Sequence, residues 1–209
     1  MNRIQLSLVM ILGMFFSMPA WAEADHETDQ AGPRSVIEST ITKMLDILEQ
    51  REDKSAISTQ DRAAIRQTIA GKFDYRSMAK RSLGRPWKKL DETDREHFTS
   101  VFRDLLERSY GNRLSAYKGQ KVIFAKAEIK QNKARVKSTI IDGSRETPVE
   151  YRLHQSKNGW QVYDIRIEGT SMVRTFYQDF KSTLDNGGYP KLVKVLEEKV
   201  AKLIAKDQG

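Results

Sequence analysis

The chain has 209 residues, enough for one large domain or two small ones. Its 36 Lys and Arg outnumber 28 Asp and Glu, which gives a formal net charge of +8, and 39% of its residues are hydrophobic, which argues against wholesale disorder. Because there is no Cys and there are only three His, the sequence excludes disulfides, thiolate catalysis and Cys-ligated metals, and it leaves little for a His-built metal site.

Residues 1–22 have the three parts of a secretory signal peptide. Arg3 supplies the positive charge, residues 6–16 form a nearly unbroken apolar run, and Ala20 and Ala22 are the small residues of a cleavage site. We therefore expect cleavage after Ala22 and a soluble, exported mature protein. The run is shorter than the ~20 residues that span a bilayer, which disfavours an uncleaved anchor. Export also argues against nucleic acid as the partner of this basic chain.

The residues after the signal peptide predict a leader and then helices. Residues 23–32 are polar and without periodicity, so we expect a flexible leader. A helix is predicted from Pro33, because apolar residues then recur every three or four positions. That apolar stripe consists of Ile37, Ile41, Met44 and Leu48.

Three more helices are predicted before residue 118. The first covers residues 59–71, with Asp61 in its first turn. The next is capped by Asp74 and ends at Gly84. A long helix over residues 93–117 carries aromatic and aliphatic side chains along one side.

The periodicity then changes from 3.6 to 2, which predicts strands. Four short runs rich in β-forming residues cover residues 121–126, 134–141, 148–154 and 160–167. Their joints are Gln131-Asn132, Asp142-Gly143 and Asn158-Gly159, which are typical turn residues. Short joints between consecutive strands predict a four-stranded antiparallel meander.

Helical patterning returns near Ser171, breaks at Gly187-Gly188 and restarts at Pro190. The order of elements predicts one α+β domain over residues 33–209, in which N-terminal and C-terminal helices pack on one face of the sheet.

The search for catalytic residues yields two weak candidates. Asp164 and Glu168 lie four residues apart and could form a carboxylate pair of the kind that glycosidases use. Ser171, His154 and Asp164 could be drawn as a triad, but no supporting motif accompanies them. The competing interpretation is that Asp164 caps a turn and Glu168 is solvated. We expect no catalytic residue and no metal site.

Three segments carry a resemblance to a known family. They are Phe73-Asp74-Tyr75 with Met78-Ala79, Leu83-Gly84 and Trp87; residues 148–153; and residues 160–171, followed by Phe180. Together they resemble the MlaC family of toluene-tolerance auxiliary components, which are periplasmic phospholipid-binding proteins. The resemblance extends in order over nearly the whole mature chain.

The resemblance implies a soluble carrier of the maintenance-of-lipid-asymmetry pathway. Such a carrier moves glycerophospholipid between an outer-membrane lipoprotein–porin complex and an inner-membrane ABC transporter with an MCE-domain subunit, docking on each transiently. The implied fold is related to cystatin-like and NTF2-like sheets, with acyl chains between sheet and helices. It implies no cofactor, only a bound phospholipid as cargo.

Two sets of residues follow as candidates for lipid contact. Because side chains alternate along strands, alternate strand residues should point towards the long helix and, with the helix residues that face them, surround the acyl chains. It consists of Phe102, Leu106, Tyr110, Val136, Ile140, Val149, Tyr151 and Val162. The second set is basic, follows the third predicted helix and is expected at the headgroup rim or a docking surface. It consists of Arg81, Arg85, Lys88 and Lys89.

Two alternative functions remain open at this point. One is an exported hydrolase that uses Asp164 and Glu168. The other is a periplasmic chaperone or adaptor that binds apolar protein segments. The second basic cluster, on the predicted hairpin over residues 126–137, is an alternative docking surface.

Overall fold

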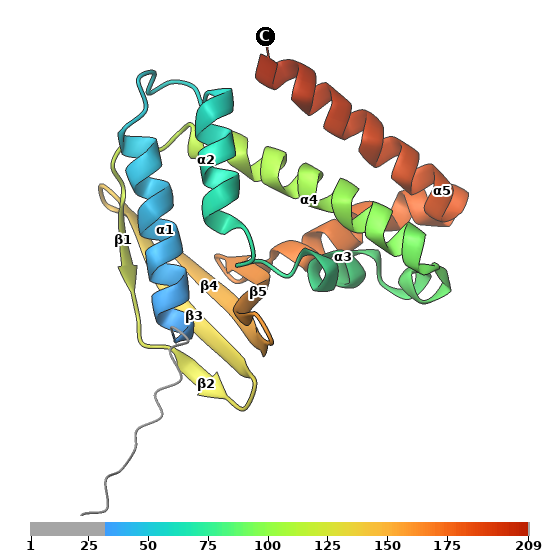
Figure 1. The fold of residues 1–209 in the computed structure, drawn as a ribbon, viewed down its shortest axis with the longest axis horizontal. Helices are drawn as coiled ribbons and strands as arrows, with labels where there is room; N and C mark the ends of the chain where they lie inside the picture. The colour runs from blue at the N-terminus through green and yellow to red at the C-terminus, as the bar shows by residue number, and fades with distance from the viewer. Residues whose placement is uncertain (1–31, 209) are drawn as a thin grey trace, which may run out of the picture. The chain divides into compact units, whose positions relative to one another are not determined.

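An antiparallel β-sheet carries helices on one face in the computed structural model of the chain, which describes residues 32–208 (Figure 1). This arrangement confirms the predicted α+β class. The described residues belong to one compact unit. The predicted signal peptide and, apart from Gly32, the predicted leader lie outside the described residues. Within residues 32–208, no helix combines the length and the hydropathy that a membrane span requires.

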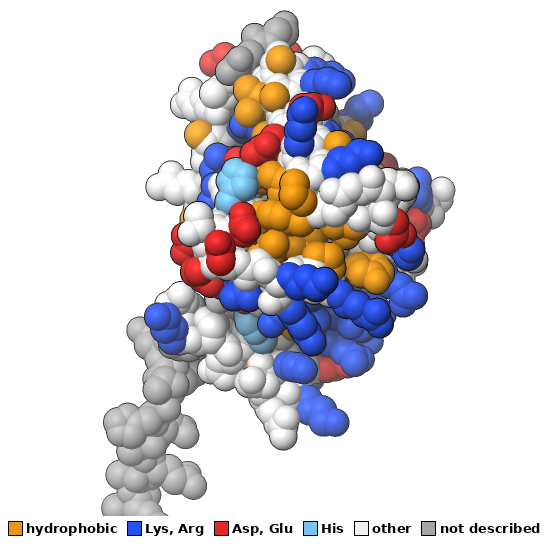
Figure 2. Space-filling view, turned by 90° about the vertical axis from the view of Figure 1, so that its right-hand side faces the viewer, with side chains coloured by type: hydrophobic (Ala, Val, Ile, Leu, Met, Phe, Trp, Pro, Cys, Tyr) orange, Lys and Arg blue, Asp and Glu red, His pale blue; other side chains and the backbone are white. Residues whose placement is uncertain are grey.

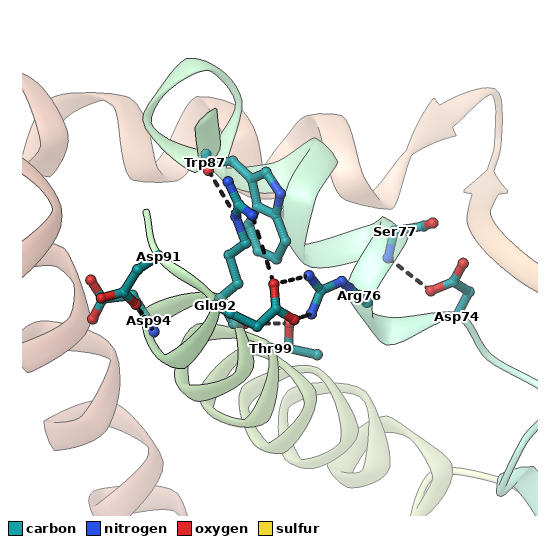
Figure 3. Close-up of polar contacts among 9 residues, drawn as sticks. Asp74, Arg76, Ser77, Trp87, Asp91, Glu92, Asp94 and Thr99 are labelled. Carbon is teal, nitrogen blue, oxygen red and sulfur yellow. Dashed lines mark hydrogen bonds and ion pairs between the residues drawn. The ribbon is translucent and has the colours of Figure 1, made fainter. Parts of the chain in front are cut away.

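Two of the helices that precede the sheet begin at capping residues that the sequence supplies. Ser58 and Asp61 cap the second helix reciprocally: the Asp61 N–H donates to Ser58 Oγ at 3.1 Å, and the Ser58 N–H donates to Asp61 Oδ2 at 3.0 Å. Asp74 caps the third by accepting from the Ser77 N–H at 2.8 Å (Figure 3). The elements are α1 (Pro33–Glu49), α2 (Thr59–Ile69), α3 (Tyr75–Leu83), the 3₁₀ helix η1 (Arg85–Lys89) and α4 (Glu92–Leu114).

The sheet has six strands, so the predicted four-stranded meander is corrected. The strands are β1 (Lys121–Phe124), β2 (Glu128–Lys130), β3 (Lys133–Asp142), β4 (Arg145–Ser156), β5 (Gly159–Ile167) and β6 (Thr170–Ser171). Their order is β1-β3-β4-β5-β6, and β2 pairs with β3 as well. The first predicted strand is thus only part of a longer edge that is interrupted at residues 125–127. The last strand is two residues long, too short to show an alternating pattern in the sequence.

Alternate residues of the three long strands are buried beneath the helices. Val136 on β3, Val149 and Tyr151 on β4, and Val162 on β5 all face inward, as the period of two predicts. Part of this face packs against α1, which lies across the sheet in Figure 1. The inner face of the sheet is therefore one wall of the protein core.

The last helix, α5 (Met172–Gln208), bends at the predicted break. Gly188 has φ 66° and ψ −165°, a backbone conformation that is essentially restricted to glycine. Pro190 follows in the first turn of the second half. The first half packs on α3 and α4, and the second half returns along α4 (Figure 1). The bend therefore lets one helix cover two parts of the core.

Candidate functional site

A cavity of about 600 Å³ lies between the inner face of the sheet and helices α1, α2, α4 and α5. Its walls are mostly apolar. On the sheet side they consist of Ile140, Val149, Tyr151, Ile165 and Ile167. The helix side includes Ile41, Met44, Ile65, Ile69, Leu106, Tyr110, Leu114, Met172 and Ile204. A volume of this size lies within the range of about 300–1,000 Å³ that is typical of ligand pockets.

The structure brings five of the eight predicted acyl-chain contacts to this cavity. These five are Leu106, Tyr110, Ile140, Val149 and Tyr151. Phe102, Val136 and Val162 do not line it, because each is fully buried in packed core. The Phe102 ring packs edge-on against Phe176, with centroids 5.2 Å apart, and the two valines belong to the cluster beneath α1. Inward-facing positions of the sheet are therefore divided between packed core and cavity wall.

Sequence reasoning missed the wall that α2 contributes. Ile65 and Ile69 are four residues apart and thus share one face of the helix. Both line the cavity, and Ile65 is the only fully buried residue of α2. The spacing of four residues between Ile65 and Ile69 could have indicated an apolar helix face. The pattern has only two members, however, and polar residues surround it.

Four charged residues from α2 and α4 also line the cavity. Arg62 and Arg66 come from α2, and Glu107 and Arg108 come from α4, so this part of the wall has a net charge of +2. Arg66 joins the two helices: its Nε lies 2.6 Å from Glu107 Oε2, and its Nη2 lies 3.1 Å from Asp104 Oδ1. The Glu107 side chain is only 10% exposed, so this ion pair is partly shielded from water.

The Tyr75 side chain lies on the same cavity wall. Burial, reinforced by the negative charge of Glu107, raises the pKa of Tyr75. The phenol therefore keeps its proton at every physiological pH, and its hydroxyl remains a hydrogen-bond donor.

None of the four basic residues predicted for a headgroup rim or docking surface lines the cavity. They are Arg81, Arg85, Lys88 and Lys89, all of which are exposed. The Arg81 guanidinium lies 4.5 Å from the centroid of the Tyr163 ring, which is a cation–π contact. Trp87, to which they are close in sequence, packs into the core formed with α4 and α5.

The segment that carries these cations is firmly attached to α4 (Figure 3). The guanidinium groups of Arg76 and Arg95 lie 5.6 and 5.9 Å from the Trp87 ring centroid, and both contact the Glu92 carboxylate. These contacts join η1, which carries Lys88 and Lys89, to α4. On the face that forms the right-hand side of Figure 1, Lys and Arg gather along one border of an apolar patch (Figure 2).

The acidic candidates have separate structural partners. Asp164 is buried, accepts the Ser171 hydroxyl and accepts the Val173 N–H at 3.3 Å, so it caps α5. Glu168 is exposed and lies 3.5 Å from Arg145. His154 Nε2 lies 2.9 Å from Asp74 Oδ2. This geometry fits the capping interpretation of Asp164. Within residues 32–208, no cluster of three His, Asp or Glu is placed to hold a metal ion.

Comparisons with known proteins agree on one family. The sequence model of the MlaC protein family matches residues 38–198. The whole chain aligns with the whole intermembrane phospholipid transport system binding protein MlaC of Haemophilus influenzae, at 22% identity. The fold is similar to that of the phospholipid-binding protein from Ralstonia solanacearum, whose structure was solved in complex with a phospholipid. That match has a TM-score of 0.75 and 24% identity, and it covers 83% of this chain and 99% of the other.

Proposed function

The chain belongs to the MlaC family, and from this premise we propose that it is a periplasmic phospholipid carrier. It holds the acyl chains of a glycerophospholipid in the cavity between sheet and helices while the lipid moves between the outer and inner membranes. The observation that carries the proposal is the cavity itself, which has about 600 Å³ of space and predominantly apolar walls. The names of the Haemophilus and Ralstonia relatives support a phospholipid as the occupant.

The energetics of lipid transfer explain why such a cavity is needed. Each methylene exposed to water costs about 0.8 kcal/mol, so two chains of ~15 methylenes would cost on the order of 20 kcal/mol in transit. Apolar walls offset most of this cost without any chemistry on the lipid. The carrier must not bind more tightly than the bilayer does, because otherwise it could not release its cargo.

The proposed partners are membrane complexes on either side of the periplasm. They are the outer-membrane lipoprotein–porin complex and the inner-membrane ABC transporter with an MCE-domain subunit. The name of the Haemophilus relative, which places that protein in an intermembrane phospholipid transport system, supports such partners. Docking is transient, and we assign it to the exposed cations around η1.

Extraction of the protein purified from the periplasm tests this function. We expect one diacyl phospholipid per chain by phosphorus assay and mass spectrometry, and an N-terminus at Glu23. Leu106→Lys, which places a charge on the cavity wall, should reduce the lipid content, whereas Lys194→Gln on the exposed side of α5 should not. Protein that emerges free of lipid, or that carries peptide in place of lipid, would contradict the proposal.

A further inference from the structure

We propose that Arg62, Arg66 and Arg108 form a binding site for the phosphodiester of the lipid, and we call them the arginine cluster. This inference rests on the proposed function and names the headgroup chemistry that the carrier recognises. It also moves the headgroup contact from the exposed cations around η1 to the cavity wall itself.

The arginine cluster is gathered at the place where α2 faces α4. Arg62 and Arg66 are four residues apart on α2 and so share one face of that helix. Arg66 contacts Glu107 on α4 at 2.6 Å, which shows that this face is directed at α4. Arg108 follows Glu107 in the sequence and lines the same cavity. Two helices therefore bring three guanidinium groups to one wall.

Gly111 on α4 makes room for one of these groups. A Cβ at this position would lie 3.3 Å from Arg62 Nη1, so a side chain here would compete with the guanidinium for space. Glycine inside a helix is less favourable than alanine. Glycine at this position leaves the Arg62 guanidinium the space that it occupies.

The chemistry of this wall suits a phosphodiester. Three arginines and one glutamate line this wall, so its lining residues carry a formal net charge of +2, which attracts a monoanion. Guanidinium groups bind phosphate oxygens through paired hydrogen bonds, which a lysine cannot reproduce. The buried Tyr75 hydroxyl lies on the same wall, beside Glu107. A phosphate oxygen at this wall would be a further acceptor for this hydroxyl.

The surroundings favour a lipid phosphate over a free one. The arginine cluster is continuous with the apolar sheet wall that includes Val149 and Ile167. A small phosphate ester would leave that wall in contact with water, whereas a phospholipid covers both parts at once. Its phosphate then lies between α2 and α4, and its acyl chains extend along the sheet.

The test compares two lipids with identical acyl chains and different headgroups. Delipidated protein is titrated with a fluorescent phosphatidylethanolamine and with the corresponding diacylglycerol, which lacks phosphate. Arg62→Gln/Arg108→Gln should lower the preference for the phospholipid by about tenfold or more, because hydrogen bonds between guanidinium and phosphate are stronger than those between neutral groups. Diacylglycerol binding should not change. Arg66 is kept, because removing it would leave the shielded Glu107 without its partner.

Two further variants make the result specific. The control variant Arg145→Gln/Arg174→Gln also removes two arginines, both of which are exposed and do not line the cavity. It should keep the wild-type preference for the phospholipid. Tyr75→Phe removes one hydroxyl only and should lower the preference severalfold, which keeps the test valid if the double variant does not fold.

Three results would overturn the inference. The first is that the arginine and tyrosine variants both keep the wild-type preference for the phospholipid over diacylglycerol. The second is that the variants lose affinity for both lipids equally. The third is tight binding of glycerol 3-phosphate, which would show a site for free phosphate esters. If the wild-type protein binds neither lipid, the proposed function fails together with the inference, an outcome distinct from the other three.

Discussion

Ser171 donates its hydroxyl to both carboxylate oxygens of Asp164, at 2.9 and 2.8 Å. The same hydroxyl oxygen accepts the Arg174 N–H at 3.2 Å. Asp164 belongs to β5 and Ser171 immediately precedes α5, so the pair fixes the start of the last helix against the sheet. Met172, which begins that helix, lines the cavity. The pair therefore positions one part of the cavity wall.

Ser171→Ala should lower the free energy of unfolding by about 1–3 kcal/mol, because the Asp164 carboxylate, only 4% exposed, loses its main donor. Urea denaturation of the delipidated protein measures this change. Ser182→Ala, at an exposed position of the same helix, should change it by less than about 0.5 kcal/mol. Equal effects of the two substitutions would show that the Asp164 contact contributes nothing specific.

Two valines on neighbouring strands distinguish the cavity wall from ordinary core. Val149 lines the cavity, whereas Val162 is fully buried and does not. Val149→Asp should fold and lose its bound lipid, because a carboxylate on a cavity wall can be hydrated. Val162→Asp should lose several kcal/mol of stability, because its charge is buried without a partner. Circular dichroism and extracted lipid per chain check both outcomes, and equal unfolding would make Val149 ordinary core.

Most of the fold could be predicted because its signals are local. Capping by Asp74, the apolar stripe of α1 and the break at Gly187-Gly188 all lie within a few residues of the feature that they specify. β6 escaped prediction because two residues carry no periodicity. Its turn depends on positive φ angles at Glu168 and Gly169, and only the glycine indicates such a conformation in the sequence.

The candidate site was less predictable, because a cavity is a property of tertiary packing. Val136 and Val149 have the same pattern in the sequence and belong to the same buried cluster, yet only Val149 lines the cavity. The contact of Arg66 with Glu107 joins residues 41 positions apart, which no local spacing shows. The position of the charged wall therefore depends on how α2 and α4 meet.

Stability should fall at high pH through Tyr189. Burial, and then the negative charges of Asp94 and Asp91, raises the pKa of Tyr189 from 10.0 to about 12. Below pH 10 the Tyr189 phenol keeps its proton in both the folded and the unfolded chain, so its full contribution to the free energy of unfolding is present. Between pH 10 and 12 only the unfolded chain releases this proton, so the contribution is lost as the pH rises.

Tyr189→Phe should therefore lose stability less steeply than the wild type between pH 10 and 12. Urea denaturation at several pH values in this window measures the two slopes. Parallel slopes would show that the Tyr189 phenol does not titrate differently in the two states.

Docking is tested by charge reversal on η1. Lys88→Glu/Lys89→Glu should slow lipid transfer to membranes that contain the proposed transporter and leave the bound lipid unchanged, because steering acts on the encounter rate. The difference should fade above about 0.15 M salt, where the screening length is about 8 Å. Lys194→Glu/Lys199→Glu on α5 is the matched control. Unaltered transfer at low salt would assign docking to the hairpin over residues 126–137.

The cavity draws its walls from both ends of the described chain, and this has a consequence for biogenesis. Ile41 of α1 and Ile204 of α5 line the same space. Because a chain is synthesised from its N-terminus, the sheet and first helices are complete while the last wall is still missing. Such an intermediate exposes apolar surface that the finished protein shields. The capacity to hold a ligand therefore arises only when α5 packs against the rest of the fold. Until then the apolar residues of the cavity are exposed to chaperones and proteases.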